Sequence, residues 1–444
     1  MNNSLKIFFS ILIIYLPLNA QQEDTLYYEG NYSVRIDSIK IAGNEITDEF
    51  IILRELTFGI GDTLNPGLAS FNRERIYSLD IFNEVKLKPF KVDDKNILIV
   101  EVEESWYIYP LPFVTLKDKD WKKISYGLAV SLKNFRGRNE KLRAVAALGY
   151  DPSFSLSYLN PNLVYKDDLF LNTVLGFSTS TNKSTTAEDL HGESFEHKNY
   201  FGWITLGKRF GLYHRFALKT SYNYVETPFY IKGVNASDDR IDRTVMIGAS
   251  YTYDTRDLAH YPSSGIYAFV SYEFKGFGIN NINYRVGDLD FREYRKFFDK
   301  LTAKWRFAIR HTAGSTVPFY DYSYLGFSER VRGYFHSGER EGNDRIIGSV
   351  ELNYPVIEET RINLYFIPIL PRSLLTYRVA IISELFIDTG TTRLEGEPLS
   401  IKNFDTGYGG GFSVLLLPYF VMRFELAFND QGQSEWIFDL GASF

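Results

Sequence analysis

Residues 301–355 hold two long segments in which apolar and polar side chains alternate. In the first segment, residues 301–311, the odd-numbered positions from 301 to 309 are apolar, whereas Lys304, Arg306 and Arg310 lie at even-numbered positions. The same alternation resumes in the second segment, residues 346–354. A period of two is that of a β-strand with one apolar and one polar face. The connection of about thirty residues is far longer than is usual in a compact domain. Long outer loops between such strands are typical of a membrane-spanning β-barrel.

Strands of this type fill the chain from residue 105 to residue 444. We count about sixteen, an even number, as in bacterial outer-membrane barrels. Many exceed the roughly 9–11 residues that a tilted strand needs to cross a bilayer. Shifting residues 301–311 by one position would bring three cations into lipid, at up to about 2–4 kcal/mol each near the midplane. A soluble sandwich would also alternate, but its strands are shorter and fewer. The expected fold is therefore mostly β, a 16-stranded antiparallel transmembrane β-barrel.

Composition agrees with a barrel and excludes several other classes of protein. Aromatic residues make up 16% of the chain, including 32 Tyr and 36 Phe, which suits strands and membrane-interface girdles. The formal net charge of −6 argues against nucleic acid as a partner. With no cysteine, disulfides, thiolate metal sites and a lipoprotein anchor are excluded. Beyond the N-terminus there is no uninterrupted apolar stretch of about 18 residues, the length of a spanning helix.

The N-terminus resembles a secretory signal peptide. Lys6 supplies the basic start, residues 7–18 are largely apolar, and Ala20 ends a plausible cleavage site. We expect residues 1–20 to be removed and residues 21–30 to be a linker. The alternative is an uncleaved N-terminal anchor, for which the apolar run is short.

Residues 31–104 predict a small α+β domain. Residues 34–41 favour a strand that ends at a Gly-Asn turn, and Thr47 or Asp48 is expected to cap a helix. Pro66 opens a second helix. Residues 84–92 and 96–102 then form a hairpin, so the order is strand, helix, helix, strand, strand.

The same domain resembles a POTRA domain, the periplasmic module of outer-membrane assembly barrels of the BamA and TamA type. The positions that carry the resemblance are Gly43-Asn44, the Arg54-Glu55-Leu56 helix end, Gly61-Asp62, and the segments 81–85 and 100–103. One such repeat fits, so the chain is expected to be a short, single-POTRA member of this superfamily with its barrel at residues 105–444.

A loop motif strengthens the resemblance. Val331, Arg332, Gly333 and Tyr334 match the superfamily's VRGF/Y signature, which lies in a loop that folds back into the barrel lumen. The alternative is an ordinary solvated loop arginine.

The partner signature of that loop, F-x-D-x-G, is matched by Phe386, Asp388 and Gly390. Strand parity places Asp388 on the same face as Glu384, opposite a row of apolar residues, so it should point inward. We therefore expect Arg332 and Asp388 to form an ion pair inside the barrel; the alternative for this motif is an ordinary turn at a strand end.

The ends of the barrel suggest a weak seam. Pro110 and Pro112 lie on one parity of the first barrel strand and lack N–H donors, and Gly441 would weaken the last strand. If the proline edge faces the last strand, closure there is weak; if it faces the second strand, the prolines only shorten that ladder. The last strand is expected to run to Phe444, a terminal aromatic that resembles the sorting signal of such barrels.

The POTRA-like domain offers a second edge. Residues 84–92 are expected to be an edge strand that could accept an extended polypeptide. Its charged side chains, among them Glu84, Lys86 and Lys88, would also protect it from aggregation.

The resemblance implies insertion or translocation of polypeptides at the bacterial outer membrane, with the POTRA domain in the periplasm. The expected partners are the lipid bilayer, unfolded or extended client polypeptides and accessory lipoproteins. The histidines lack the spacing of a metal site, and the Gly409–Gly411 run suits a kink in a strand better than a nucleotide-binding loop. We therefore expect that the protein is not an enzyme and binds no cofactor. Two alternatives stay open: a two-partner secretion translocator, for which residues 21–30 are short of a plug helix, and a passive outer-membrane channel.

Overall fold

The computed structural model describes residues 33–116, 121–164, 167–298, 300–326, 329–334, 340–367, 371–418 and 420–444. The expected signal peptide and linker lie outside these residues. The N-terminal domain contains β1 (Val34–Arg35), β2 (Ser38–Ala42), α2 (Glu49–Leu53), β3 (Thr63–Leu64), α3 (Pro66–Tyr77), β4 (Phe82–Val92) and β5 (Lys95–Glu104). In the described chain, β2, β5 and β4 form a three-stranded sheet in that order.

Local sequence explains most of these elements. Asn65 caps α3 by accepting from the N–H of Leu68, with Pro66 in the first turn. Asp93 and Asp94 adopt positive φ in the β4–β5 turn.

Two expectations for this domain were wrong. Residues 34–41 form two strands, because β1 pairs with β3 while β2 pairs with β5. Asp48 stands before α2 but makes no side-chain cap bond.

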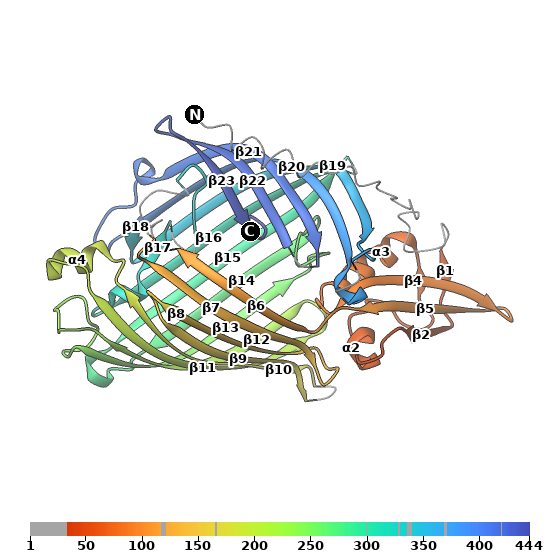
Figure 1. Ribbon diagram of the computed structural model, residues 1–444, viewed down its shortest axis with the longest axis horizontal. Coiled ribbons are helices and arrows are strands. Elements are labelled where there is room, and N and C mark those ends of the chain that lie inside the picture. Colours follow the sequence, from red (N-terminus) through yellow and green to blue (C-terminus); the bar gives the residue numbers. More distant parts are fainter. Residues whose placement is uncertain are drawn as a thin grey trace.

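The barrel is an antiparallel sheet of sixteen strands, as expected. Each strand hydrogen-bonds to the next along the chain, and β19 follows β16 (Figure 1). The strands are β6 (Ile108–Leu116), β7 (Ile124–Phe135), β8 (Glu140–Gly149), β9 (Ser153–Val164), β10 (Leu169–Thr181), β11 (Glu196–Phe210), β12 (His214–Glu226), β13 (Ile241–Asp254), β14 (Gly265–Lys275), β15 (Tyr284–Phe297), β16 (Leu301–Gly314), β19 (Asp344–Asn363), β20 (Thr376–Arg393), β21 (Asp405–Leu417), β22 (Phe420–Asn429) and β23 (Ser434–Leu440).

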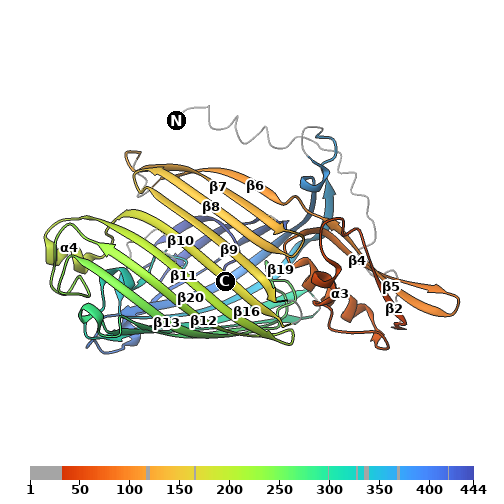
Figure 2. The same ribbon diagram turned by 90° about the horizontal axis from the view of Figure 1, so that it is seen from below.

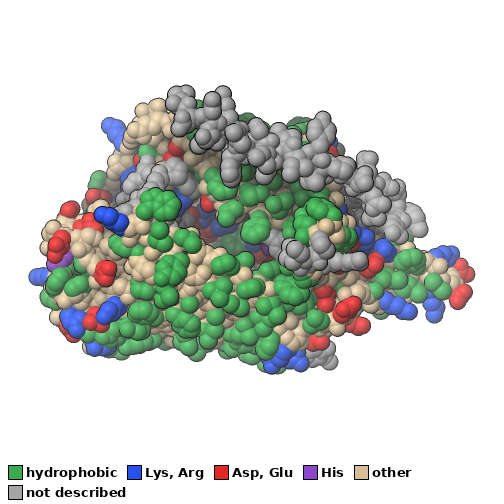
Figure 3. Space-filling view, in the orientation of Figure 1, with side chains coloured by type: hydrophobic (Ala, Val, Ile, Leu, Met, Phe, Trp, Pro, Cys, Tyr) green, Lys and Arg blue, Asp and Glu red, His purple; other side chains and the backbone are tan. Residues whose placement is uncertain are grey.

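The two faces of these strands separate as their alternation predicted. On β16 the Phe307 side chain lies outside, whereas Lys304 is buried inside the barrel beside Glu351. Hydrophobic side chains dominate the visible outer wall of the barrel (Figure 3). None of the helices in the described ranges has the length and hydrophobicity to cross a membrane.

The long loop between β16 and β19 folds back into the barrel. It carries the short 3-10 helix η3 (Phe319–Asp321) and two short paired strands, β17 (Ser323–Leu325) and β18 (Arg340–Gly342). Leu325 and Val331 of this loop pack against Ile347 of β19 in a buried cluster. The other connections hold α4 (Thr185–His191), η2 (Ile279–Asn281), η4 (Arg372–Leu374) and η5 (Ile401–Asn403).

The last strand ends earlier than expected. β23 stops at Leu440, and Gly441 takes φ 107°, which favours glycine over other residues. The turn carries residues 442–444 out of strand register, so that Phe444 lines a cavity inside the barrel and its carbonyl accepts from the Tyr294 hydroxyl at 3.2 Å. The expectation that the strand runs in apolar register to Phe444 was therefore wrong.

The N-terminal domain sits against one end of the barrel (Figure 2). Its core is continuous with residues of the barrel wall, since Leu258, Tyr261 and Ala380 belong to the same buried cluster as Ile76 and Tyr77 of α3. Domain and barrel therefore form one packed body in the described chain.

Candidate functional site

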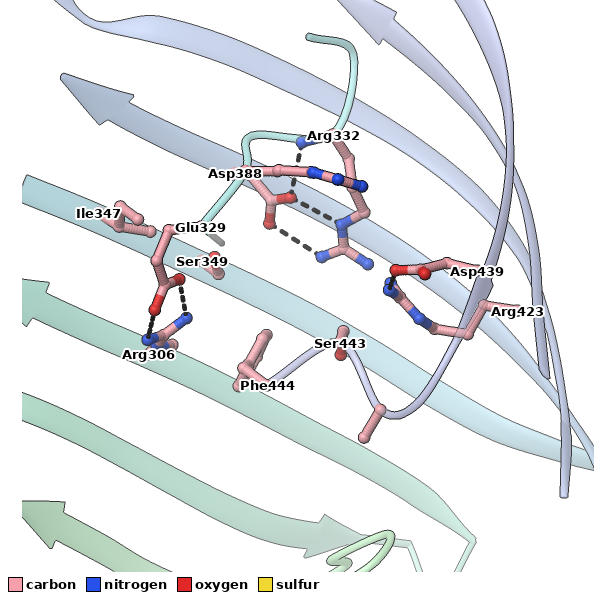
Figure 4. Close-up of a pocket in the computed structure, with 12 residues that line it drawn as sticks. Arg306, Glu329, Arg332, Ile347, Ser349, Asp388, Arg423, Asp439, Ser443 and Phe444 are labelled. Carbon is pink, nitrogen blue, oxygen red and sulfur yellow. Dashed lines mark hydrogen bonds and ion pairs between the residues drawn. The ribbon is translucent and has the colours of Figure 1, made fainter. Parts of the chain in front are cut away.

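The Arg332 guanidinium forms a two-pronged pair with the Asp388 carboxylate inside the barrel (Figure 4). Its Nε lies 2.6 Å from Asp388 Oδ2 and its Nη2 lies 2.8 Å from Oδ1. The Arg332 backbone N–H also donates to Asp388, at 3.2 Å. Both side chains are almost fully buried. Paired, charge-assisted bonds of this geometry fix orientation as well as position, so the two sequence motifs meet in one directional contact.

Two further carboxylates surround the same arginine. Arg332 Nη1 lies 3.0 Å from Glu351 Oε2 of β19 and 2.8 Å from Glu425 Oε1 of β22. Glu351 is shared with Lys304 at 3.0 Å, and Glu425 is shared with Arg423 at 3.2 Å. One loop residue thus ties β19, β20 and β22 together through three buried carboxylates, two of which also pair with a second cation.

Phe386 adds an aromatic contact to the pair. The guanidinium carbon of Arg332 lies 3.7 Å from the centre of the Phe386 ring, within the range of a cation–π interaction. Phe386 belongs to a buried cluster with Ala427 of β22 and Ile437 of β23. The Phe and the Asp of the strand motif therefore hold the same arginine.

Glycines in and beside the motifs let the loop lie directly on the barrel wall. Gly333 takes φ 99°, and a Cβ there would lie 2.8 Å from the Phe428 carbonyl oxygen. A Cβ on Gly407 of β21 would lie only 1.6 Å from the Arg332 carbonyl oxygen, and one on Gly390 would lie 3.0 Å from Val331. The loop can approach the wall closely at these positions because glycine has no side chain.

Gly407→Ala should displace the loop, because the added methyl would overlap the Arg332 backbone. Overlap with backbone typically costs about 1–3 kcal/mol, and we expect faster protease cleavage within residues 315–343 of the folded barrel. Gly348→Ala is the matched control, since its Cβ would meet only Thr389, at an ordinary 3.5 Å. Equal cleavage rates in the two variants would contradict the close approach.

The pair borders a cavity of about 310 Å³ in the lumen. Arg306, Glu329, Arg423, Asp439 and Phe444 are among its lining residues. Arg306 makes two bonds with Glu329, at 2.8 and 2.9 Å, and Arg423 lies 2.7 Å from Asp439. The C-terminal residues thus end beside the pinned loop, in surroundings of paired charges.

The first and last barrel strands lie at the two ends of the sheet. Across the described ranges, β6 pairs with β7 alone and β23 pairs with β22 alone. The Lys133 N–H donates to the Tyr107 carbonyl at 2.7 Å. In an antiparallel ladder every second residue points its N–H and C=O to the same side. Residues of the other parity, which include Pro110 and Pro112, therefore direct their backbone groups away from β7, toward the free edge.

Buried ion pairs hold the N-terminal domain on the barrel. Glu55 at the end of α2 lies 2.5 Å from Arg209 of β11 and 2.8 Å from Arg75. Glu74 of α3 lies 3.0 Å from Arg378 of β20 and also contacts Arg73. The side chains of these pairs are largely buried, so removing one partner would leave a buried charge unpaired.

The expected edge strand β4 does lie at the edge of its sheet, but one end of it is covered. Asn83 donates to the Ser373 carbonyl at 2.6 Å, and Glu84 lies 2.5 Å from Arg361 of β19. Lys86 pairs with Glu84, and Lys88 pairs with Glu101 of β5. The part of the edge that remains open runs from Lys86 toward the hairpin tip.

Acid should weaken the docking of the N-terminal domain. Burial by itself raises the pKa of Glu74, but Arg378 and Arg73 outweigh it, so the pKa lies below its usual 4.5. Burial also raises the pKa of Glu55, but Arg209 outweighs it, so this pKa too lies below its usual value. A carboxylate whose pKa is lower in the folded state than in the unfolded state stabilises the folded state at pH values above its unfolded-state pKa. That stabilisation is lost as the pH falls through its folded-state pKa. The docked state is therefore expected at pH 7 and should be lost progressively below pH 4.5.

Spin labels at cysteines replacing Ile60 and Ile401, both exposed, measure this docking in a chain without native cysteines. The distance distribution should be narrow at pH 7 and broad in acid. In Glu74→Gln it should be broad already at pH 7. A wild-type distribution that stays narrow in acid would contradict the assignment.

Residues 134–444 match the Omp85 superfamily domain. The chain belongs to the Omp85 superfamily. Residues 34–105 match the POTRA family described as a surface antigen variable number repeat. Like the superfamily, the barrel lies in the outer membrane and its POTRA domain in the periplasm. The β7–β8 turn and the other turns beside the POTRA domain are thus periplasmic.

Individual relatives of this Omp85 protein agree in fold. It is 31% identical over 87 residues to the outer membrane protein assembly factor BamA of Neorickettsia risticii (strain Illinois), a match that covers 19% of this chain and only 12% of the relative. BamA from Haemophilus ducreyi lacking POTRA domains 1–3 aligns with a TM-score of 0.54 at 16% identity, over 92% of this chain and 84% of that one. CdiB from Escherichia coli aligns with a TM-score of 0.55 at 12% identity, over 91% and 75%.

Several residues of this site were not predicted from the sequence. Glu351 and Glu425 lie on inward parities, as Asp388 does, but many other polar side chains share those parities. Gly407 carries no motif of its own. The docking pairs Glu55–Arg209 and Glu74–Arg378 join residues at least 150 positions apart, and no local pattern links such positions.

Proposed function

We propose that this Omp85 protein inserts polypeptides into the outer membrane or passes them across it. Client strands would be engaged at the seam between β6 and β23 and at the open part of β4. The observation that carries the proposal is the free edge of β6, whose outward backbone positions include two prolines.

Missing donors make that edge a poor partner for permanent closure. Each proline removes one hydrogen bond, worth about 1 kcal/mol, from the ladder that β6 could form with β23. The carbonyl groups of the same positions remain acceptors. An extended client strand could pair with them temporarily, which is the chemistry of β-augmentation.

The turn at Gly441 supports the same proposal. Because β23 ends at Leu440 and residues 442–444 lie inside the barrel, the last strand is short opposite the nine residues of β6. A client strand could extend the sheet where β23 is absent.

The POTRA domain would deliver clients to this seam. The segment from Lys86 to Val92 keeps an unpaired strand edge, while the ion pairs at Glu84 and Glu74 hold the domain beside the barrel. The same charges that protect the edge from aggregation leave its backbone groups available to an extended chain in the periplasm.

Depletion of the protein tests the function directly. Loss of β-barrel proteins from the outer membrane, with their precursors accumulating in the periplasm, is the expected result. Loss confined to secreted proteins would favour translocation across the membrane. A change in solute uptake alone, with both protein sets intact, would identify a passive channel and overturn the proposal.

A further inference from the structure

The hairpin formed by the periplasmic ends of β19 and β20 extends past β16, the neighbouring wall strand on the β19 side. β19 pairs with β16 only as far as Asn353 but continues to pair with β20 up to Asn363, while β20 stays paired with β21 as far as Arg378. Two register shifts, between Pro355 and Thr360, bend this extension. In Figure 2 the mid-blue hairpin projects beyond the outline of β6 and β7 at the rim next to the POTRA domain. Periplasmic turns of such barrels are usually short, so this extension calls for its own explanation.

The inner face of the extension is charged and holds the POTRA domain. Arg361 lies directly opposite Arg378 in the ladder, so both point to the same face. Arg361 lies 2.5 Å from Glu84 and 3.1 Å from Glu103, while Arg378 lies 3.0 Å from Glu74. Two arginines of the barrel thus meet three carboxylates of the POTRA domain.

The outer face of the same extension is apolar. The opposed pairs that point away from the POTRA domain are Ile357 with Ile381, Thr360 with Val379, and Ile362 with Tyr377. At the tip, the Phe366 side chain is 66% exposed. Ile357 is also exposed, and the other five side chains of these pairs are partly exposed. Apolar side chains gathered on such a face usually mark an interaction site.

The outer face is also continuous with the lipid-facing wall. Along β19 the exposed outward side chains Val350, Leu352, Tyr354, Val356 and Ile357 follow one another without a break. When a wall strand bends outward at the rim, its lipid-facing side turns back toward the membrane. The exposed ion pair between Lys300 and Glu358, 2.5 Å apart, lies at the bend, where charged groups would meet lipid headgroups.

We propose that the outer face of the β19–β20 extension lies on the periplasmic leaflet of the outer membrane, with Phe366 and its neighbours in the boundary between headgroups and acyl chains. The lipids of that leaflet are the partner, as for other amphipathic elements at an interface. Because Arg361 and Arg378 on the opposite face bind Glu74, Glu84 and Glu103, the extension holds the POTRA domain against the membrane surface. This inference concerns lipid contact and is independent of the proposed client function.

Single cysteines carrying an environment-sensitive fluorophore test the contact, because the chain has no native cysteine. The full-length protein with Phe366→Cys is reconstituted into phosphatidylcholine vesicles that contain lipids spin-labelled near the headgroup. Ile60→Cys on the POTRA domain is the aqueous control, and Leu385→Cys on the barrel wall is the acyl-chain control; both side chains are well exposed. Resistance of the folded barrel to SDS at room temperature confirms that each variant is intact.

The label at position 366 should be quenched several-fold more by the shallow spin label than the label at position 60, and it should be shielded from iodide in the buffer. The label at position 385 should be quenched best by spin labels deep in the acyl chains. If the label at position 366 behaves like that at position 60, open to iodide and insensitive to lipid, the leaflet contact does not exist; a face reserved for another protein would give that result.

Discussion

Arg332→Ala is expected to abolish the proposed assembly activity while the barrel still inserts into the membrane. The substitution removes the cation shared by Asp388, Glu351 and Glu425. Breaking a buried ion pair by removing one partner costs about 3–5 kcal/mol, enough to release the loop that the pair holds. Cells that depend on the variant should lose β-barrel proteins from the outer membrane, to the extent seen on depletion.

Two further variants separate this role from a general loss of charge. Arg332→Lys keeps the positive charge but loses the two-pronged geometry and the contact with Phe386, so its activity should be intermediate. Arg295→Ala removes an exposed arginine that contacts Glu293 and the Trp305 ring on the outer face, away from the loop, and should keep full activity. Normal outer-membrane protein levels in Arg332→Ala, with changed conductance alone, would contradict the account and favour a passive channel.

The sheet could be predicted from the sequence because membrane and lumen impose opposite demands on neighbouring residues. Lys304, Arg306 and Arg310 fix the register of β16, as the buried Arg423 and Glu425 do for β22. Strand parity placed Asp388 on the inner face of β20. That Arg332 would reach it was implied by the resemblance of the two motifs to the superfamily's signatures.

What could not be predicted depends on the path of the chain in space. Inward parity makes Glu351 and Glu425 candidates, but only the folded loop selects them from the other polar side chains of the lumen. Phe444 continues the apolar alternation of β23, yet the turn at Gly441 takes it into the lumen. Alternation cannot reveal a turn at a residue that is free to adopt positive φ.

The docking of the POTRA domain was equally hidden. Glu74 looks like an ordinary charged residue of an amphipathic helix, and Arg378 like one of several inward-facing arginines. Their contact requires the packing of two domains whose sequences carry no shared pattern. The length of the β19–β20 extension was also obscured, because its two bulges interrupt the alternation after Pro355.

Locking the seam is expected to stop the activity without unfolding the protein. A disulfide between β6 and β23 would close the edge where a client strand is proposed to pair, whereas the rest of the sheet would be unchanged. The chain contains no cysteine, so each introduced pair forms a single defined bond. A control disulfide between Val130 and Ala144, which are opposed on β7 and β8, crosslinks two strands that are already paired.

The most direct measurement compares these two disulfide variants in cells that depend on them, before and after reduction. The account predicts that the oxidised β6–β23 variant fails to assemble outer-membrane proteins and recovers when the bond is reduced, while the β7–β8 variant works in both states. Full assembly activity in the oxidised β6–β23 variant would contradict the claim that clients use the seam.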